Sequence, residues 1–188
     1  MLKRFFVFTL LAGAAVAVIA GCDADPEQQR SVVSVTSFNC NAPAFADIRT
    51  DSSSYADTWA FTVFLNRPYD PLTVTASGLP YGDFQITSYQ IEWTPLNGAP
   101  ALPAPIRQEA LSFSIGSGET VGVSIRLVNI SEKSFIYNLN PSSVYDYLAN
   151  ITFVGHEVGT SRNTQVLTSA TVEFANYSPD PEQVSCSF

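Results

Sequence analysis

The chain has 188 residues, of which 46% are hydrophobic, 12% are aromatic and only 14% are charged. This composition excludes a disordered chain, which needs low hydrophobicity and a high density of charge, and the length allows one domain or two small ones. The formal charge of −8, with 9 basic residues, argues against nucleic acid as a partner, because phosphate binding depends on clustered lysine and arginine. The 3 cysteines leave one over if the other two pair.

The amino terminus has the layout of an export signal. Lys3 and Arg4 precede an apolar run over 5–20, which carries no charge and ends in small residues. A membrane-spanning helix needs about 20 apolar residues, so this run is short for a span and typical of a secretory signal.

The sequence at the end of this run, Ile19-Ala20-Gly21-Cys22, resembles the lipobox of bacterial lipoproteins. The resemblance implies that residues 1–21 are a signal peptide and that Cys22 becomes the new amino terminus. It also implies a diacylglyceryl group on the thiol of Cys22 and an acyl chain such as palmitate on its amine. Two or more acyl chains anchor a protein stably, whereas one gives marginal binding. A conventional signal cleaved nearby and an uncleaved anchor are the alternatives.

The predicted mature chain is more acidic than the whole. Removal of residues 1–21 takes away Lys3 and Arg4 and no acid, so the formal charge changes from −8 to −10. Residues 22–31 are polar and lack an apolar periodicity, which indicates a tether between the lipid and a domain over 32–188. We therefore expect a protein of the bacterial cell envelope, lipid-anchored to a membrane and facing the periplasm or the cell surface. Asp23 resembles an inner-membrane retention signal of enteric bacteria, but that rule varies between bacterial groups, so the choice of membrane stays open.

The two remaining cysteines, Cys40 and Cys186, lie near the two ends of the predicted domain. An exported compartment is oxidising, so an even pair predicts a disulfide. In the chain-entropy model, closing so long a loop stabilises the fold by up to about 5 kcal/mol. A metal or redox site would favour a CxxC spacing or neighbouring histidines, and the sequence has neither.

Between these cysteines, apolar and polar residues alternate in short runs, as is typical of strands. The runs with the clearest alternation are 57–65, 120–130, 147–153 and 166–174. In the first of them, one parity is predicted to face the core, with Trp59, Phe61, Val63 and Leu65. The apolar parity changes within 83–93, which predicts a bulge near Ser88.

Shorter candidate strands are 31–38, 72–76 and 110–115. No part of the mature sequence shows a convincing helical stripe, and at most one helical turn is expected over 141–148, with Asn140 as its cap and Pro141 at its first position. Tyr145 and Tyr147 open an alternating strand, and residues 155–163 indicate the last hairpin. Several short strands separated by turn signals favour an antiparallel β-sandwich.

This pattern over residues 31–188 resembles the immunoglobulin-like or fibronectin-like modules of bacterial surface proteins. The resemblance implies an all-β, antiparallel immunoglobulin-like β-sandwich of about 7–9 strands, with Trp59 and Trp93 as candidate core aromatics. A disulfide between the two ends of the domain departs from the antibody pattern, in which the bridge joins two central strands. The chain also resembles small uncharacterised exported lipoproteins, which imply no activity.

The catalytic motifs that we considered are weak. His156 is the only histidine, so any serine or cysteine triad would need it, and its place between Gly155 and Glu157 predicts an exposed turn residue. The GxSxG, HExxH and P-loop patterns do not occur. We therefore expect no cofactor and no metal, and we assign no catalytic residue.

The acidic residues leave two alternatives open. Asp47, Asp51 and Asp57 cluster before the Trp59 strand, and oxygen-rich loops of this kind can bind calcium, although the EF-hand order is missing. A glycoside hydrolase requires only two facing carboxyl groups. A solvated connection between strands is the simpler interpretation of the acidic cluster.

Two further features concern partners. The proline-rich stretch 95–105 favours an extended crossover between strands, with recognition of its PxxP spacing as the alternative. Loop tyrosines can stack on sugars or anchor an interface, and the candidates are Tyr55, Tyr69, Tyr81 and Tyr177. The leading hypothesis is a non-catalytic structural, adhesive or assembly module for an envelope protein or glycan partner. A carboxylate-based hydrolase of cell-wall or extracellular polysaccharide is the alternative.

Overall fold

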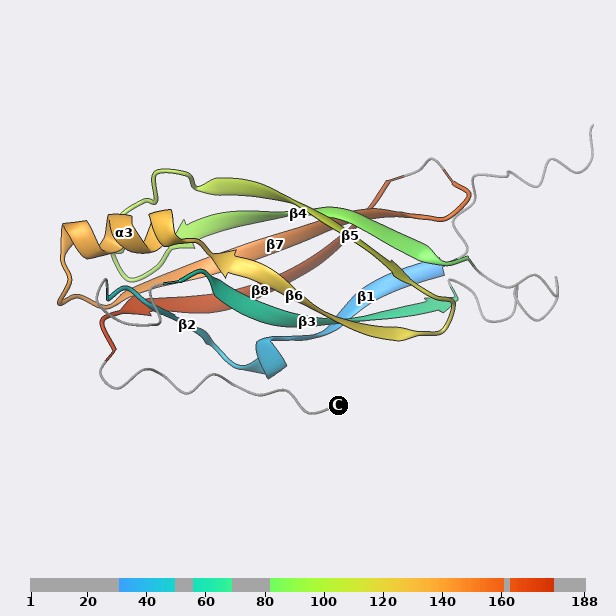
Figure 1. Cartoon of the computed structure of the whole chain (residues 1–188), viewed down its shortest axis with the longest axis horizontal. Coiled ribbons are helices and arrows are strands. Elements are labelled where there is room, and N and C mark those ends of the chain that lie inside the picture. Colours follow the sequence, from blue (N-terminus) through green and yellow to red (C-terminus); the bar gives the residue numbers. More distant parts are fainter. Residues whose placement is uncertain (1–30, 50–55, 69–81, 161–162, 178–188) are drawn as a thin grey trace, which may run out of the picture.

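The computed structural model describes residues 31–49, 56–68, 82–160 and 163–177, which form two sheets packed face to face and one short helix (Figure 1). The predicted signal peptide, Cys22, the strand predicted over 72–76 and Cys186 lie outside the described residues. In chain order the elements are β1 (Ser31–Phe38), η1 (Asn39–Asn41), β2 (Ala44–Asp47), β3 (Thr58–Pro68), β4 (Phe84–Pro95), β5 (Ile106–Ile115), β6 (Thr120–Val128), α3 (Ile130–Leu139), β7 (Tyr145–Glu157) and β8 (Thr164–Ala175).

The strands divide into a three-stranded sheet in the order β1-β3-β6 and a five-stranded sheet in the order β2-β8-β7-β4-β5. After β1 the chain turns through η1 and joins the other sheet as β2. This is an immunoglobulin-like β-sandwich, so the predicted fold class and strand number are confirmed. The pair β2 and β8 is parallel, which corrects the purely antiparallel prediction. The physical reason is that β2 continues in the direction of β1 after the short turn of η1.

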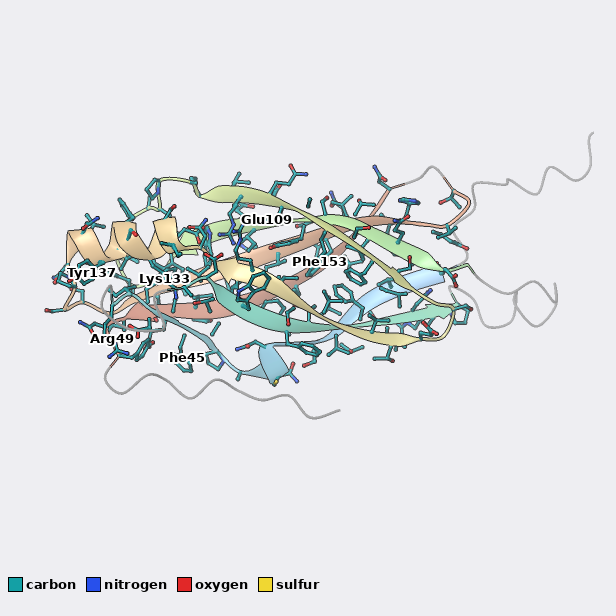
Figure 2. The ribbon with its side chains drawn as sticks, viewed as in Figure 1. Phe45, Arg49, Glu109, Lys133, Tyr137 and Phe153 are labelled. Carbon is teal, nitrogen blue, oxygen red and sulfur yellow. The ribbon has the colours of Figure 1, made fainter. Side chains whose placement is uncertain are left out.

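The core lies between the two sheets and is rich in aromatic side chains. Phe64 of β3 contacts Phe113 of β5 and Phe153 of β7, with ring centroids 5.2 and 4.8 Å apart. Phe153 points into the space between the sheets in Figure 2. A second group joins Trp93, Tyr147 and Phe174, all of them buried. The inward parities predicted for 147–153 and for 120–130 are confirmed, because Tyr147, Ile151 and Leu127 are fully buried.

The bulge predicted near Ser88 is confirmed. The register of β4 shifts between Ile86 and Ser88 against both of its neighbours, β5 and β7. Gly155 of β7 faces this bulge, and a Cβ there would collide with the carbonyl oxygen of Gln85. The shift places Phe84, Ile86 and Ile91 in the core although their parities differ, so a single inserted residue explains the change of alternation.

The prediction for the first long strand is wrong. The buried face of β3 carries the other parity, with Ala60, Thr62, Phe64 and Asn66, while Trp59 is 55% exposed. Asn66 tolerates burial because the nitrogen of its side-chain amide is hydrogen-bonded, whereas the buried hydroxyl of Thr62 has no hydrogen-bond partner among the described residues. The amide of Asn66 donates to the carbonyl oxygens of Gly82 and Ile115, each at 3.1 Å. The alternation correctly predicted a strand, but the face with Trp59 and Phe61, which was predicted to face the core, is the outer face of the sheet.

The helix α3 corrects the expectation that no ten-residue helix occurs. Its buried residues are Glu132, Lys133 and Ile136, so charged side chains hide the apolar stripe on which helix prediction depends. Asn129 caps the helix through a capping box with Glu132. The turn expected at 141–148 is also wrong, because Asn140 is the C-cap of α3 and Tyr145 already belongs to β7.

The start of β1 and the helix lie at opposite ends of the sandwich. Ser31, the last residue of the predicted tether, opens β1 at one end, whereas α3 lies at the other (Figure 1). The buried carboxylate of Glu157 accepts hydrogen bonds from the backbone amides of Ser31 (3.2 Å) and Gly82 (2.8 Å) at the tether end. The thirteen residues of β7 run most of the way between the ends, about 43 Å at a strand's usual rise. We call the end that carries α3 the distal end. Among the described residues, α3 is neither long nor apolar enough to cross a membrane.

Candidate functional site

The surface that best fits a binding role is the outer face of the three-stranded sheet. We define this outer face as Trp59, Phe61, Val63 and Leu65 of β3 with their cross-strand neighbours on β1 and β6. Cross-strand partners share one face of a sheet. The partners on this face are Ser34 and Ser37 of β1, and Thr120, Gly122, Ser124 and Arg126 of β6. A central apolar row therefore lies between two rows that are mostly small or hydroxyl-bearing.

The absence of a side chain at Gly122 makes room for the aromatic ring of Phe61. A Cβ on Gly122 would collide with the ring of Phe61, so the ring occupies the space that a side chain would fill. Val63, which pairs with Gly122, is only 4% exposed although it belongs to this outer face. Trp59 stands at the distal end of the row, where it presents more than half of its surface to solvent.

A network of charges lies beside Trp59. Its cross-strand partner Arg126 donates two hydrogen bonds of 2.6 Å to Glu109 of β5 and contacts Asp57 at 3.3 Å. These carboxylates raise the pKa of Arg126, chiefly through the hydrogen bond to Glu109. The other oxygen of Asp57 accepts the backbone amide of Ile130 at 3.0 Å, which ties the start of α3 to the start of β3. The charge of Arg126 is therefore balanced within the protein.

Glu132 is the buried centre of this network. It accepts hydrogen bonds from the indole of Trp93 (3.1 Å), from Arg107 (2.9 Å) and from the backbone of Asn129 (2.8 Å). Arg107 also donates to the carbonyl oxygens of Arg126 and Leu127, at 2.9 and 2.7 Å. Burial raises the pKa of Glu132, an effect that the charge of Arg107 and the hydrogen bonds only partly offset. The arrangement joins β4, β5, β6 and α3, so its role is structural. We call Glu132 with Trp93, Arg107 and Asn129 the Glu132 clasp.

A second polar cluster lies where β2 ends. Asp47 receives three hydrogen bonds from Arg49, two from its guanidinium (2.7 and 2.9 Å) and one from its backbone amide (3.0 Å). Burial alone would raise the pKa of Asp47, but these bonds outweigh it and lower the pKa.

Lys133 of α3 is buried at this end of the molecule, where Figure 2 also shows Arg49. Burial lowers the pKa of Lys133 despite the attraction of Asp47 and Asp57.

A groove of about 410 Å³ runs between β1 and β8 beside η1. It forms because β2 pairs with β8 only from Val172 onward. Its lining contains threonine, serine and asparagine and no charged residue. One wall is the turn η1, in which Asn39, Cys40 and Asn41 all adopt positive φ. The side-chain amide of Asn39 bonds the carbonyl oxygens of Ala42 and Pro43, which holds this unusual turn.

The structure places the predicted site residues as follows. Cys40 lies in η1, and Cys186 is outside the described residues, so their disulfide stays a prediction. His156 lies within β7, opposite Gln85, and is half-buried. This corrects the prediction of an exposed turn residue, because β7 extends to Glu157 and the turn begins only after it.

Of the acidic cluster, Asp47 and Asp57 lie among the described residues, and each of them binds an arginine. Asp47 binds Arg49 and Asp57 binds Arg126, while Asp51 is outside the described residues. Groups of three or more metal-ligating side chains do not occur in the part of the chain that the structure describes.

The proline-rich stretch does connect β4 to β5, as predicted. Its carbonyl oxygen at Pro100 accepts the hydroxyl of Tyr147 at 2.7 Å, and burial raises the pKa of that tyrosine to about 12. Of the loop tyrosines, Tyr177 donates a hydrogen bond of 2.6 Å to Glu173 and packs its ring against Phe45, which fits the capping role. The other three, Tyr55, Tyr69 and Tyr81, lie outside the described residues.

Sequence reasoning missed the outer face and the Glu132 clasp. The signal for the clasp was available, since Asn129 followed three residues later by Glu132 is a capping box. The outer face had no such signal, because an apolar row on a strand does not say which side it covers.

Comparisons with known proteins leave the family open. No protein-family model matches the chain, and no curated protein matches it. One similar solved structure is a late embryogenesis abundant (LEA) protein, with 10% identity, a TM-score of 0.39, and 92% of this chain and 86% of that chain covered. Another is PapD-like domain 7 of human CEP192, with 8% identity, a TM-score of 0.31, and coverage of 84% and 91%. Likenesses this distant carry no argument about function.

Proposed function

We propose that this protein is a bacterial envelope lipoprotein whose β-sandwich acts as a non-catalytic binding module. Cys22 carries the lipid, residues 22–30 form the tether, and the distal end with the neighbouring outer face meets an envelope protein or glycan partner. Because the tether enters the sandwich at Ser31, the distal end is the part that points away from the membrane.

The observation that carries this proposal is the distribution of exposed large apolar side chains. Five of the seven in the described residues lie toward the distal end, namely Trp59, Ile106, Ile130, Leu139 and Val144. The other two are Val158 near the tether and Leu167 on β8. Scattered exposed apolar residues need no explanation, but a group that includes tryptophan, with arginine beside it, has the composition of interaction sites.

The state of the acidic groups supports a non-catalytic role. Glu109, Glu132 and Asp57 are each bound to an arginine, and these contacts join β5 to the helix, β6 to β5, and β6 to the start of β3. A carboxyl group that is bound to an arginine in this way stabilises the fold. We find nothing among the described residues that favours the polysaccharide hydrolase.

The anchor is tested by the mass of the protein extracted from its own membrane. A chain that begins at Cys22 should carry the added mass of diacylglyceryl and acyl groups, and Cys22→Ser should release the protein from the membrane fraction. A chain that begins at Cys22 without lipid mass would contradict the anchor.

The binding role is tested by site-specific photo-crosslinking on native membranes. A photo-reactive residue at Ile130 should form adducts, whereas the same residue at Val158, a similarly exposed aliphatic position near the tether, should not. Matching adducts at both positions, or none at either, would contradict a partner at the distal end.

A further inference from the structure

Building on the proposed function, we propose that the outer face binds an uncharged linear glycan, with Trp59 as its stacking platform and the hydroxyl rows on β1 and β6 as its hydrogen-bonding partners. This proposal follows from four properties of this face: aromatic exposure, flanking hydroxyls, balanced charge and narrow width.

The exposed aromatic side chain of this face is Trp59, and the half-buried Phe61 follows it in the same row. Trp59 is 55% exposed, and Phe61 lies two residues further along the same face with its ring held over Gly122. The flat faces of indole and phenyl rings attract the polarised C–H groups on one side of a pyranose ring, because the face of an aromatic ring carries negative charge density. Alternate residues on a strand are about 6.8 Å apart, so a row of side chains that continues beyond Trp59 along the strand suits a ligand that is itself a chain.

Hydroxyl groups flank this row on both sides. Ser124 is the cross-strand partner of Phe61, and Thr120 and Ser34 are partners of Leu65 on opposite sides. A serine or threonine hydroxyl both donates and accepts, as sugar hydroxyls do. A glycan that stacks on the central row therefore meets groups of matching chemistry at its edges.

The charge on this face favours a neutral ligand. Arg126 is already paired with Glu109 and Asp57, so it can donate a remaining hydrogen bond without demanding an anionic partner. The cross-strand positions of the central row carry no acid. An anionic polysaccharide or a nucleic acid would also meet the repulsion of a mature chain with many more acids than bases.

The width of the row argues against a protein as occupant of this face. A stable protein interface buries about 800 Å² on each partner. Here the apolar row is a single strand wide, neighbouring strands lie about 4.8 Å apart, and Val63 in its middle is only 4% exposed. A ligand one sugar wide can use such a row, whereas a folded protein would gain little from it.

The test uses the mature lipidated protein in detergent, with chitohexaose and cellohexaose as neutral probes. Of the two tryptophans, Trp93 is 4% exposed and Trp59 is 55% exposed, so iodide quenching of fluorescence reports Trp59. At least one probe should protect Trp59 from iodide. By calorimetry, Trp59→Ala should weaken binding about tenfold or more, and Trp59→Phe, which keeps an aromatic ring, should weaken it less. The matched control is Leu167→Ala, since Leu167 is 70% exposed on the other sheet; it should bind as the wild type does.

The outcomes separate this inference from the proposed function. If neither saccharide binds while the Ile130 cross-linker still forms adducts that Val158 does not, the glycan inference is overturned and the binding module stands. If Trp59→Ala binds as tightly as the wild type, or if polygalacturonate binds more tightly than both neutral probes, the inference is also overturned. Unchanged melting temperatures of the Trp59 variants would show that these variants fold and that their weaker binding has another cause.

Discussion

Replacing Glu132 with alanine should destabilise the protein more than any other single change in its charge network. Glu132 is 4% exposed and accepts hydrogen bonds from Trp93 of β4, from Arg107 of β5 and from the backbone of Asn129, the cap of its own helix. Removing one partner of a buried ion pair costs about 3–5 kcal/mol, because the other charge stays buried. The loss of the helix cap alone accounts for about 1 kcal/mol of this. Most of the effect therefore comes from the buried guanidinium and the indole.

The matched control is Glu109→Ala. Glu109 binds Arg126, whose side chain is 37% exposed and keeps its contact with Asp57. Glu109 also lies 3.3 Å from Arg107, which keeps its bond to Glu132. A partly exposed pair of this kind contributes about 1 kcal/mol or less. Urea unfolding followed by tryptophan fluorescence measures both variants, because Trp93 moves from the core into water. Equal losses for the two variants, or a loss below about 1 kcal/mol for Glu132→Ala, would refute the assignment of Glu132 as the centre of the clasp.

The dependence on pH gives this prediction a second test. Because burial raises the pKa of Glu132, the folded state takes up a proton more readily than the unfolded state does. The wild type therefore gains stability at this group as the pH falls through the folded-state pKa toward the unfolded value near 4.5. Glu132→Ala lacks that gain, so the free-energy difference between the two proteins should widen on acidification. A difference that narrows instead would show that the charge on Glu132 is net stabilising.

Three further predictions concern other parts of the fold. Asp47→Asn should lower the free energy of unfolding at pH 7. Because the bonds from Arg49 lower the pKa of Asp47, the difference in stability between wild type and variant should disappear as the pH falls below about 4 through the folded-state pKa. A difference that persists at that pH would contradict the role of Asp47. Gly155→Ala should cost about 1–3 kcal/mol in urea unfolding, because its Cβ would collide with the backbone of β4, and wild-type stability would show that the strands can separate freely. Alkylation of the unreduced protein should find Cys40 and Cys186 blocked; two free thiols would contradict their disulfide.

Periodicity predicted the strands well where one face had to be buried and the other had to be solvated. In β7 every second residue from Tyr147 to Phe153 is fully buried, so alternation, strand position and core coincide. The bulge in β4 was predictable for the same reason, since a slip of one residue between Ile86 and Ser88 would otherwise turn the apolar side chains outward.

The helix could not be predicted from periodicity because its buried face is charged. Glu132 enters the interior because Arg107 and the indole of Trp93, which lie on distant strands, bind it there. Lys133 is buried beside it and is attracted by the carboxylates of Asp47 and Asp57. Those partners are brought by the sheet, and no local window of sequence contains them. Only the capping box at Asn129, which is a local feature, was visible in advance.

The failure at β3 has a different cause and bears on function. Both faces of this strand carry apolar side chains, and the face with Phe64 is the buried one because Phe113 and Phe153 from the opposite sheet pack against it. The apolar row that begins with Trp59 was therefore left on the solvent side, where folding gives no reason to keep an exposed tryptophan. Trp59 is the large aromatic side chain that the core leaves exposed among the described residues, and the glycan proposal therefore starts from this side chain.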